Sequence, residues 1–232
     1  MNLILASSSP RRQELLDQLD FPYRIQVPEG VDESSVSGSA YTVSRKLARL
    51  KAEWVLENGD ATEDAFVVGC DTVVCIVSGA QERMLGKPAS ETEARQMLGV
   101  LSGSSHRVIS AVAVARAGSP TRVEAEVSHV TFKKLEEADI DSYVQTGDPM
   151  DKAGAYGIQT AGRELVASIR GCYLNIVGLP MMLLCSMLKL ETAYACPCAC
   201  ACSCACSCSC ACACSCSCSC SCPCSCSCSC SC

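Results

Sequence analysis

The run of residues 3–16 restricts the fold most, because it has the pattern of a strand that enters a helix through a short polar turn. A brief apolar segment is followed by three serines, and Pro10 suits the first position of a helix, where no backbone N–H is needed. Ser9 is a suitable N-cap residue. The run therefore predicts a strand, a turn and a helix that begins at Pro10.

Arg11 and Arg12 then lie in the first turn of this helix. Positive charges are unfavourable there by about 0.3–1 kcal/mol each, because the helix dipole is positive at its N-terminus. A bound anion would reverse the sign of this interaction, contacted by serine hydroxyls, backbone N–H groups and two guanidinium groups. The pattern favours a phosphate site at Ser9, Arg11 and Arg12, and a solvated basic turn after a buried strand is the alternative.

Composition divides the chain into two parts. All lysine, arginine, aspartate, glutamate and histidine residues lie before residue 192, whereas 19 of the 23 cysteines follow residue 195. From Cys196 onward, cysteine alternates with serine, alanine or proline, a low-complexity pattern that cannot build a core. We expect a folded domain over residues 1–191 and a disordered Cys-rich tail over 192–232. Soft-metal binding, disulfide crosslinking and acylation are alternative roles for the tail.

The charged part of the chain argues against several classes of protein. A net charge of −6 disfavours general nucleic-acid binding, which needs a basic surface. The first apolar segment is too short for a secretion signal, and the late apolar run over 181–188 is too short to span a membrane. These features predict a cytoplasmic protein without nucleic-acid or membrane partners. Residues without metal-ligand spacing are expected to be structural, namely Cys70, Cys75, Cys172, Cys185, His106 and His129.

Hydrophobic patterns alternate between helix and strand periods along the body. The helical pattern of residues 39–57 places Val43, Leu47, Leu50 and Trp54 on one face. The remaining expected elements are strands at 66–77, 107–115 and 122–132, the last two paired as a hairpin, a capped helix from Ser90 to before Gly103, a short helix ending at Gly147 and a last helix from Pro180. This order predicts an α/β fold with a mixed sheet flanked by helices.

Asp71 interrupts the apolar strand expected at residues 66–77. An ionised carboxylate is costly in such surroundings unless it is paired, hydrogen-bonded or bound to a metal. A bend at Gly69 that exposes Asp71, or a salt bridge to a lysine, would be a purely structural explanation. The functional alternative is a carboxylate at a strand end that binds a divalent ion or activates water.

Six motifs along residues 3–190 resemble, in order, those of the Maf family of nucleoside triphosphate pyrophosphatases. The first family string, Leu-Ala-Ser-x-Ser-Pro-Arg-Arg-x-Glu-Leu-Leu, is matched by residues 5–16. The others are the Gly-x-Asp-Thr strand at 67–74, Gly86-Lys87-Pro88, Leu101-Ser102-Gly103 with His106, the run 151–159 and Val177-Gly178-Leu179-Pro180. The resemblance implies a two-lobed body with a long twisted sheet, similar to the inosine triphosphatase fold, and an active cleft between the lobes.

The resemblance also implies a reaction: hydrolysis of a nucleoside triphosphate between its α- and β-phosphates, giving the monophosphate and pyrophosphate. It implies that Asp71 is the catalytic acid/base and that Glu33 and Asp71 hold Mg²⁺ or Mn²⁺. The expected substrate contacts are Ser9, Arg11, Arg12, Lys51, Thr72, Lys87, Lys152 and Gln159. Judged singly, the lysines are more often surface residues with buried stems, and the glycines near Lys152 are ordinary turn residues.

Base choice depends on Thr72 in this resemblance. An Asp-Thr pair goes with the dTTP and UTP branch of Maf-like proteins, and an Asp-Gln pair goes with the 7-methyl-GTP branch. Ser104-Ser105 and Ser110-Ala111 depart from the family pattern, so modified pyrimidine nucleotides stay open as substrates. The alternatives are a 7-methyl-GTP pyrophosphatase and a non-enzymatic regulator of cell division or septum formation. The resemblance further implies a possible homodimer.

Overall fold

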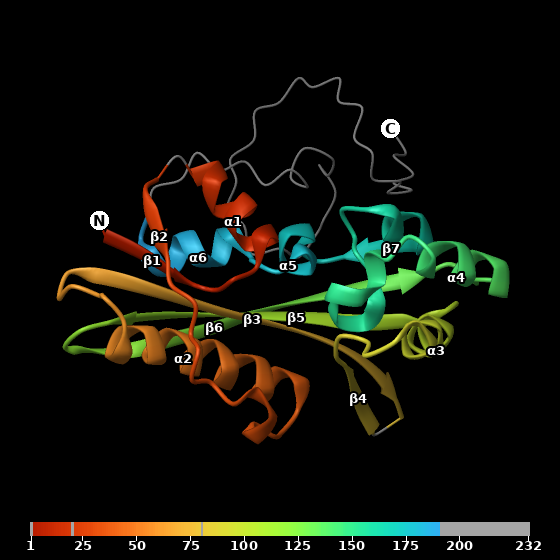
Figure 1. Ribbon diagram of the computed structural model, residues 1–232, viewed down its shortest axis with the longest axis horizontal. Coiled ribbons are helices and arrows are strands. Elements are labelled where there is room, and N and C mark those ends of the chain that lie inside the picture. Colours follow the sequence, from red (N-terminus) through yellow and green to blue (C-terminus); the bar gives the residue numbers. More distant parts are fainter. Residues whose placement is uncertain (1, 20, 80, 191–232) are drawn as a thin grey trace, which may run out of the picture. The chain divides into compact units, whose positions relative to one another are not determined.

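A mixed sheet of seven strands forms the centre of the protein (Figure 1). The computed structural model describes residues 2–19, 21–79 and 81–190, and the tail expected at 192–232 lies outside them. The strands are β1 (Asn2–Ala6), β2 (Tyr23–Ile25), β3 (Ala65–Ser78), β4 (Gln81–Leu85), β5 (Ser105–Arg116), β6 (Ser119–Phe132) and β7 (Val166–Arg170). Their order is β2-β1-β3-β5-β6-β7, with β4 paired to β3. Strand β1 is parallel to β2 and β3 and the other pairs are antiparallel, so the predicted mixed sheet is confirmed.

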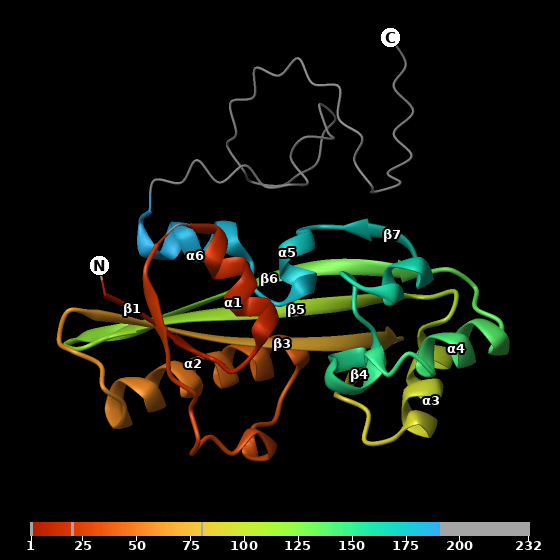
Figure 2. The ribbon, with the colours of Figure 1, turned by 45° about the horizontal axis from the view of Figure 1, so that its top comes forward.

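Helices cover both faces of this sheet. They are α1 (Pro10–Leu16), α2 (Ala40–Asn58), α3 (Glu91–Leu101), α4 (Glu137–Val144), α5 (Tyr173–Val177) and α6 (Met181–Leu188). Helix α2 lies on one face, and α1, α5 and α6 lie on the other (Figures 1 and 2). Strands β3, β5 and β6 are long, with α1, α2 and α6 toward one end and β4, α3 and α4 toward the other. All of these elements belong to one compact unit, Met1–Thr192.

Helix α2 packs unusually closely against β3. A Cβ atom on Gly69 would lie 2.2 Å from the carbonyl oxygen of Ala48, so only glycine permits this approach. Ala48 and Ala52 are fully buried on the contact face, whereas Leu50, which the sequence pattern places on that face, is 40% exposed. The prediction for Leu50 is therefore wrong, because a close helix–sheet contact selects small side chains rather than the largest apolar ones.

The start of α3 follows the expected capping pattern. The Ser90 side chain accepts a hydrogen bond from the backbone N–H of Glu93, at 3.2 Å. The helix buries Ala94, Met97 and Leu98, as its periodicity predicts. Residues 105–132 form the expected β5–β6 hairpin, whose turn contains Gly118 with a φ of 69°.

Candidate active site

Strand β3 has a gap in its pairing along one edge. Residues 65–69 pair with β1 and residues 74–78 pair with β4, whereas β5 occupies the opposite edge from residue 67 to residue 75. Because a strand has only two edges, residues 70–73 lack a strand partner on the β1/β4 side within the described sheet. Strands β1 and β4 both end at this gap, so the serine turn after β1 and the Gly86-Lys87 turn after β4 enter it from opposite ends.

A cleft of about 1170 Å³ opens at this gap. Its walls come from the β1–α1 turn, α2, the middle of β3, the end of β4, the 151–160 segment and the end of α5. All of the predicted site residues line it: Ser9, Arg11, Arg12, Glu33, Lys51, Asp71, Thr72, Lys87, Lys152 and Gln159. The structure thus brings them together around one cavity, while the role of each stays a prediction.

On the α2 face of β3, three charged groups form a cluster. The ammonium nitrogen of Lys51 lies 2.7 Å from Asp71 Oδ1 and 2.8 Å from Glu33 Oε1. The Lys51 and Asp71 side chains are only 12% and 10% exposed, whereas Glu33 is largely exposed. The salt bridge that the sequence offered as one explanation of Asp71 is therefore present. The alternative explanation, a bend at Gly69 that exposes Asp71, is wrong, because β3 continues through Gly69.

The tight packing at Gly69 explains why these charges meet. Gly69 and Asp71 point to the same face of β3, since side chains alternate along a strand. Lys51 precedes Ala52, whose backbone nitrogen would be 2.7 Å from a Cβ on Gly69. The close approach of α2 therefore carries Lys51 over Asp71.

On the opposite face of β3, Arg12 is held entirely by neutral acceptors. Its Nε donates to the carbonyl oxygen of Gly178 at 3.0 Å, Nη1 donates to Ser7 Oγ at 3.0 Å, and Nη2 donates to Thr72 Oγ1 at 3.3 Å. No carboxylate among the described residues forms an ion pair with it. Within the described part of the chain, Arg12 is thus a fixed positive charge without a carboxylate partner, which suits a guanidinium that receives a phosphate.

The serine turn is ordered by its own backbone. Ser9 is the N-cap of α1, as predicted, but its side chain makes no capping hydrogen bond. The Ser9 carbonyl oxygen instead accepts from the backbone N–H groups of Arg12 and Gln13, and the Ser9 N–H donates to Ser7 Oγ at 3.2 Å. The Ser9 hydroxyl is therefore left for the cleft that it lines.

Arg11 and Lys152 share a carboxylate at the mouth of the cleft. Arg11 Nη1 lies 2.8 Å from Asp151 Oδ2, and Lys152 Nζ contacts Asp151 Oδ1. Burial alone would raise the pKa of Asp151, but the hydrogen bonds from Lys152 and Arg11 outweigh burial and lower this pKa to about 2. Lys87 and Gln159 are exposed at the same cleft.

A buried polar network below Thr72 was not predicted from the sequence. Thr72 Oγ1 lies 2.8 Å from Ser110 Oγ, which donates to the carbonyl oxygen of Asn175 at 2.8 Å. The Asn175 amide also accepts from Ser110 N and donates to Val108 O and to Ser128 Oγ, at 2.8–3.0 Å. The network fixes α5 to β5 and β6, and α5 ends beside Gly178, the partner of Arg12. One polar residue inside an otherwise apolar helix is the signal that could have revealed Asn175.

His106 lies in the core of the protein. His106 is buried and its Nε2 lies 2.8 Å from the hydroxyl of Tyr156. Its ring packs edge-on against Phe132 and Tyr156. Burial lowers the pKa of His106 to about 4, so the ring is neutral near pH 7. Neither His106 nor His129 lines the cleft.

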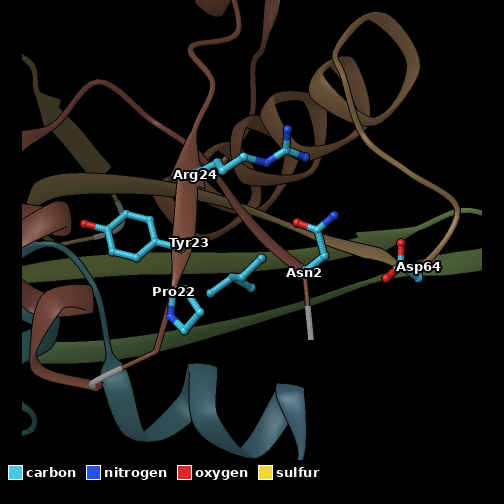
Figure 3. A pocket seen from close by; sticks show the side chains of 6 residues that line it. Asn2, Pro22, Tyr23, Arg24 and Asp64 are labelled. Atoms are coloured by element: carbon cyan, nitrogen blue, oxygen red, sulfur yellow. The ribbon is translucent and has the colours of Figure 1, made fainter.

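A second hollow of about 430 Å³ lies at the β2 edge of the sheet (Figure 3). Its lining residues are Asn2, Leu3, Pro22, Tyr23, Arg24 and Asp64. It shares no residue with the cleft and contains none of the predicted site residues. The predicted site residues therefore all lie at the cleft beside the gap in β3.

Among the described residues, no group of three or more histidine, cysteine, aspartate or glutamate side chains is arranged to hold a metal ion. Nor does any helix there have the length and apolar character needed to cross a membrane.

The fold and the cleft define a class: an α/β protein with a cleft lined by both basic and acidic side chains at a gap in its sheet. Residues 2–191 match the family model described as Maf-like protein. A dTTP/UTP pyrophosphatase from Symbiobacterium thermophilum is 49% identical over 180 residues, which cover 77% of this chain and 88% of that protein. A dTTP/UTP pyrophosphatase from Pelotomaculum thermopropionicum is 45% identical over 189 residues, which cover 81% of this chain and 95% of that protein. The chain belongs to the Maf-like protein family, as its motifs predict.

Solved structures show weaker likenesses. A dITP/XTP pyrophosphatase from Mycobacterium abscessus has 16% sequence identity and a TM-score of 0.38, and the match covers 58% of this chain and 76% of that one. The Ham1 protein of Staphylococcus aureus has 12% identity and a TM-score of 0.46, with 83% of this chain and 100% of that one covered.

Proposed function

We propose that this protein is a nucleoside triphosphate pyrophosphatase that hydrolyses dTTP and UTP to the nucleoside monophosphate and pyrophosphate. The observation that carries the proposal is the position of Asp71, a largely buried carboxylate that lines the cleft beside Lys51 at the unpaired stretch of β3. The names of relatives more than 40% identical over most of the chain support the same reaction.

In this proposal, Asp71 acts on a water molecule. It lines the cleft, and Lys51 holds one of its oxygens at 2.7 Å, so the carboxylate has a fixed direction. A general base at this position orients or deprotonates the water that attacks phosphorus. Arg12, Lys51 and Lys87 stabilise the negative charge that develops on the leaving pyrophosphate. The reaction needs no covalent intermediate.

Glu33 and Asp71 fit a divalent cation. Their oxygens lie 2.8 and 2.7 Å from the same nitrogen of Lys51, so the two carboxylates already converge on one positive charge. Mg²⁺ is usually held by one or two carboxylates together with substrate phosphates and water. Glu33 and Asp71 would hold Mg²⁺ or Mn²⁺, and the bound metal would neutralise phosphate oxygens. The expected homodimer and cytoplasmic location stay predictions.

Pyrophosphate release with Mg²⁺ from dTTP, UTP, CTP, 7-methyl-GTP and ITP tests the proposal. We expect release from dTTP and UTP, and a loss of about 10²- to 10⁴-fold in Asp71→Asn, the range of a general base. Asp141→Asn is the matched control, because Asp141 pairs with Arg95 at 2.7 Å and does not line the cleft. Release from 7-methyl-GTP alone would overturn the pyrimidine assignment. No release from any nucleotide would favour a regulatory binding protein.

A further inference from the structure

One carboxylate joins two cations of the cleft that come from distant parts of the chain. Asp151 Oδ2 accepts from Arg11 Nη1 at 2.8 Å, and Asp151 Oδ1 accepts from Lys152 Nζ at 2.5 Å. Arg11 belongs to α1, and Asp151 ends a short 3-10 helix, Asp148–Asp151. Each carboxylate oxygen therefore contacts a different cation, and the two cations are presented by different walls of the cleft.

The fold does not depend on this arrangement. Lys152 is already held by Asp148, whose carbonyl oxygen lies 2.8 Å and whose Oδ1 lies 3.0 Å from Lys152 Nζ. Asp148 is itself fixed by hydrogen bonds from the hydroxyls of Tyr143 and Thr160. The Asp151 side chain is 63% exposed, and ion pairs of such exposure contribute little to stability.

The pairing of Arg11 and Lys152 differs from that of Arg12. Arg12 has only neutral partners among residues 2–19, 21–79 and 81–190, so an anion can add to it without displacing another anion from these residues. Arg11 and Lys152 are already neutralised by an oxyanion of the same chemistry as a phosphate, with two oxygens on two cations. A phosphate that binds Arg11 Nη1 and Lys152 Nζ therefore competes with Asp151 for both atoms, while Lys152 keeps Asp148 as a second partner.

We propose that Asp151 competes with the phosphates of the substrate for Arg11 and Lys152, and pairs with both cations again as pyrophosphate leaves. This inference rests on the proposed function. A nucleotide also has a base and a sugar that contact the cleft, so it can compensate for the displacement of Asp151. Pyrophosphate has only phosphate contacts, so the competing carboxylate keeps the affinity for this product low.

Titration calorimetry with pyrophosphate and Mg²⁺ tests the competition directly, because it needs no turnover. We expect Asp151→Asn to bind pyrophosphate about 3- to 10-fold more tightly than the wild type, since exposed ion pairs no longer have to be broken. The inhibition constant of pyrophosphate against dTTP hydrolysis should fall by the same factor. Asp141→Asn removes an equal charge from the Arg95 pair outside the cleft lining, and should leave both values unchanged.

Two outcomes would overturn this inference. Unchanged affinity in Asp151→Asn would show that the carboxylate is not displaced, and weaker binding would show that it holds Arg11 and Lys152 in place for the anion. The failure of this inference can be distinguished from the failure of the proposed function. If the wild type hydrolyses dTTP but Asp151→Asn binds pyrophosphate no more tightly, only the competition fails; if the wild type hydrolyses no nucleotide, the proposed function itself fails.

Discussion

The two faces of β3 at the cleft are built on different principles. On the α2 face, Lys51 is enclosed by the carboxylates of Glu33 and Asp71. On the other face, Arg12 and Thr72 belong to a network of hydroxyls, amides and carbonyl oxygens that contains no carboxylate of the described residues. Adjacent residues of one strand, Asp71 and Thr72, thus face a charged cluster and a neutral network.

The difference separates what a ligand can rearrange from what it cannot. Ion pairs at a cleft can exchange partners, because a metal ion or a phosphate replaces one charge by another of the same sign. A buried neutral network has no such replacement, because each unpaired donor or acceptor keeps its full desolvation penalty. The charged face therefore suits the chemistry, and the neutral face suits a fixed geometry around Arg12.

The substitution Lys51→Met tests the charged face most directly. It removes the cation between Glu33 and Asp71 and keeps the length of the side chain. We expect kcat/KM for dTTP to fall by about 10²- to 10³-fold, because a preorganised charge is lost at the reacting phosphates. Steady-state kinetics measure this. Lys46→Met is the matched control on the same helix, since Lys46 is exposed and contacts only the Ser37 carbonyl oxygen in the described part of the chain. A change of less than threefold in Lys51→Met would mean that the cluster serves packing alone.

The substitution Asn175→Ala removes the most hydrogen bonds from the network on the neutral face. Asn175 is fully buried, and its removal leaves Ser110 N, Val108 O and Ser128 Oγ without the amide partner. We expect the free energy of unfolding to fall by about 2–4 kcal/mol, measured by urea denaturation, because buried polar groups lose their hydrogen bonds. Asn58→Ala is the control, since Asn58 donates to Trp54 O at the exposed end of α2, and should change stability by less than about 0.5 kcal/mol. Equal losses in both variants would contradict the special role of the network.

The neutral face also contains a group that pH can charge. His106 lies on the same side of β5 as Ser110, and burial lowers its pKa from 6.5 to about 4. The unfolded chain therefore binds a proton more readily than the folded one, so stability is complete above about pH 6.5 and falls as the pH drops toward 4. The loss should reach about 2–3 kcal/mol, since one pKa unit corresponds to about 1.4 kcal/mol.

Urea denaturation between pH 7 and pH 4.5 measures this slope. His106→Leu should flatten it, whereas His129→Gln, at a partly exposed histidine, should keep most of it. The ion pairs of Asp151 with Arg11 and Lys152 do not contribute to the pH dependence of stability between pH 7 and pH 4.5. The pKa of Asp151 is lowered to about 2, so its contribution is present above about pH 4 and is lost only as the pH falls through 2. An unchanged slope in His106→Leu would assign the pH dependence to other groups.

The sequence predicts the longer elements well, because their patterns are local. The start of α1 at Pro10, the span of α2 and the capped start of α3 follow from propensity and capping alone. Strand β4 could not be predicted in this way, since four of its five residues are exposed and show no apolar alternation. It forms because β3 extends beyond the end of β1 and offers a free edge.

The candidate site likewise has residues that local motifs predict and contacts that depend on tertiary packing. Motifs place Ser9, Arg12 and Asp71 in the chain, but no spacing reveals that Lys51 lies between Glu33 and Asp71. That contact depends on Gly69, which brings α2 close to β3. The neutral network is less visible still, because Ser110 and Asn175 act through buried hydrogen bonds between elements that lie far apart in the sequence.

The smallest expected effect comes from Thr72→Val, which changes the residue where the two faces adjoin. The substitution keeps the shape of the side chain and removes the hydroxyl that accepts from Arg12 Nη2, contacts Ser110 Oγ and donates to the Gly178 carbonyl oxygen at 3.3 Å. Arg12 keeps Ser7 and Gly178 as partners, so we expect KM for dTTP to rise by only about fivefold, the loss of about one hydrogen bond. Thr72→Ser restores the hydroxyl and should restore KM. A loss above about 100-fold, confined to kcat, would instead place Thr72 in the chemistry beside Asp71 and remove the distinction between the two faces.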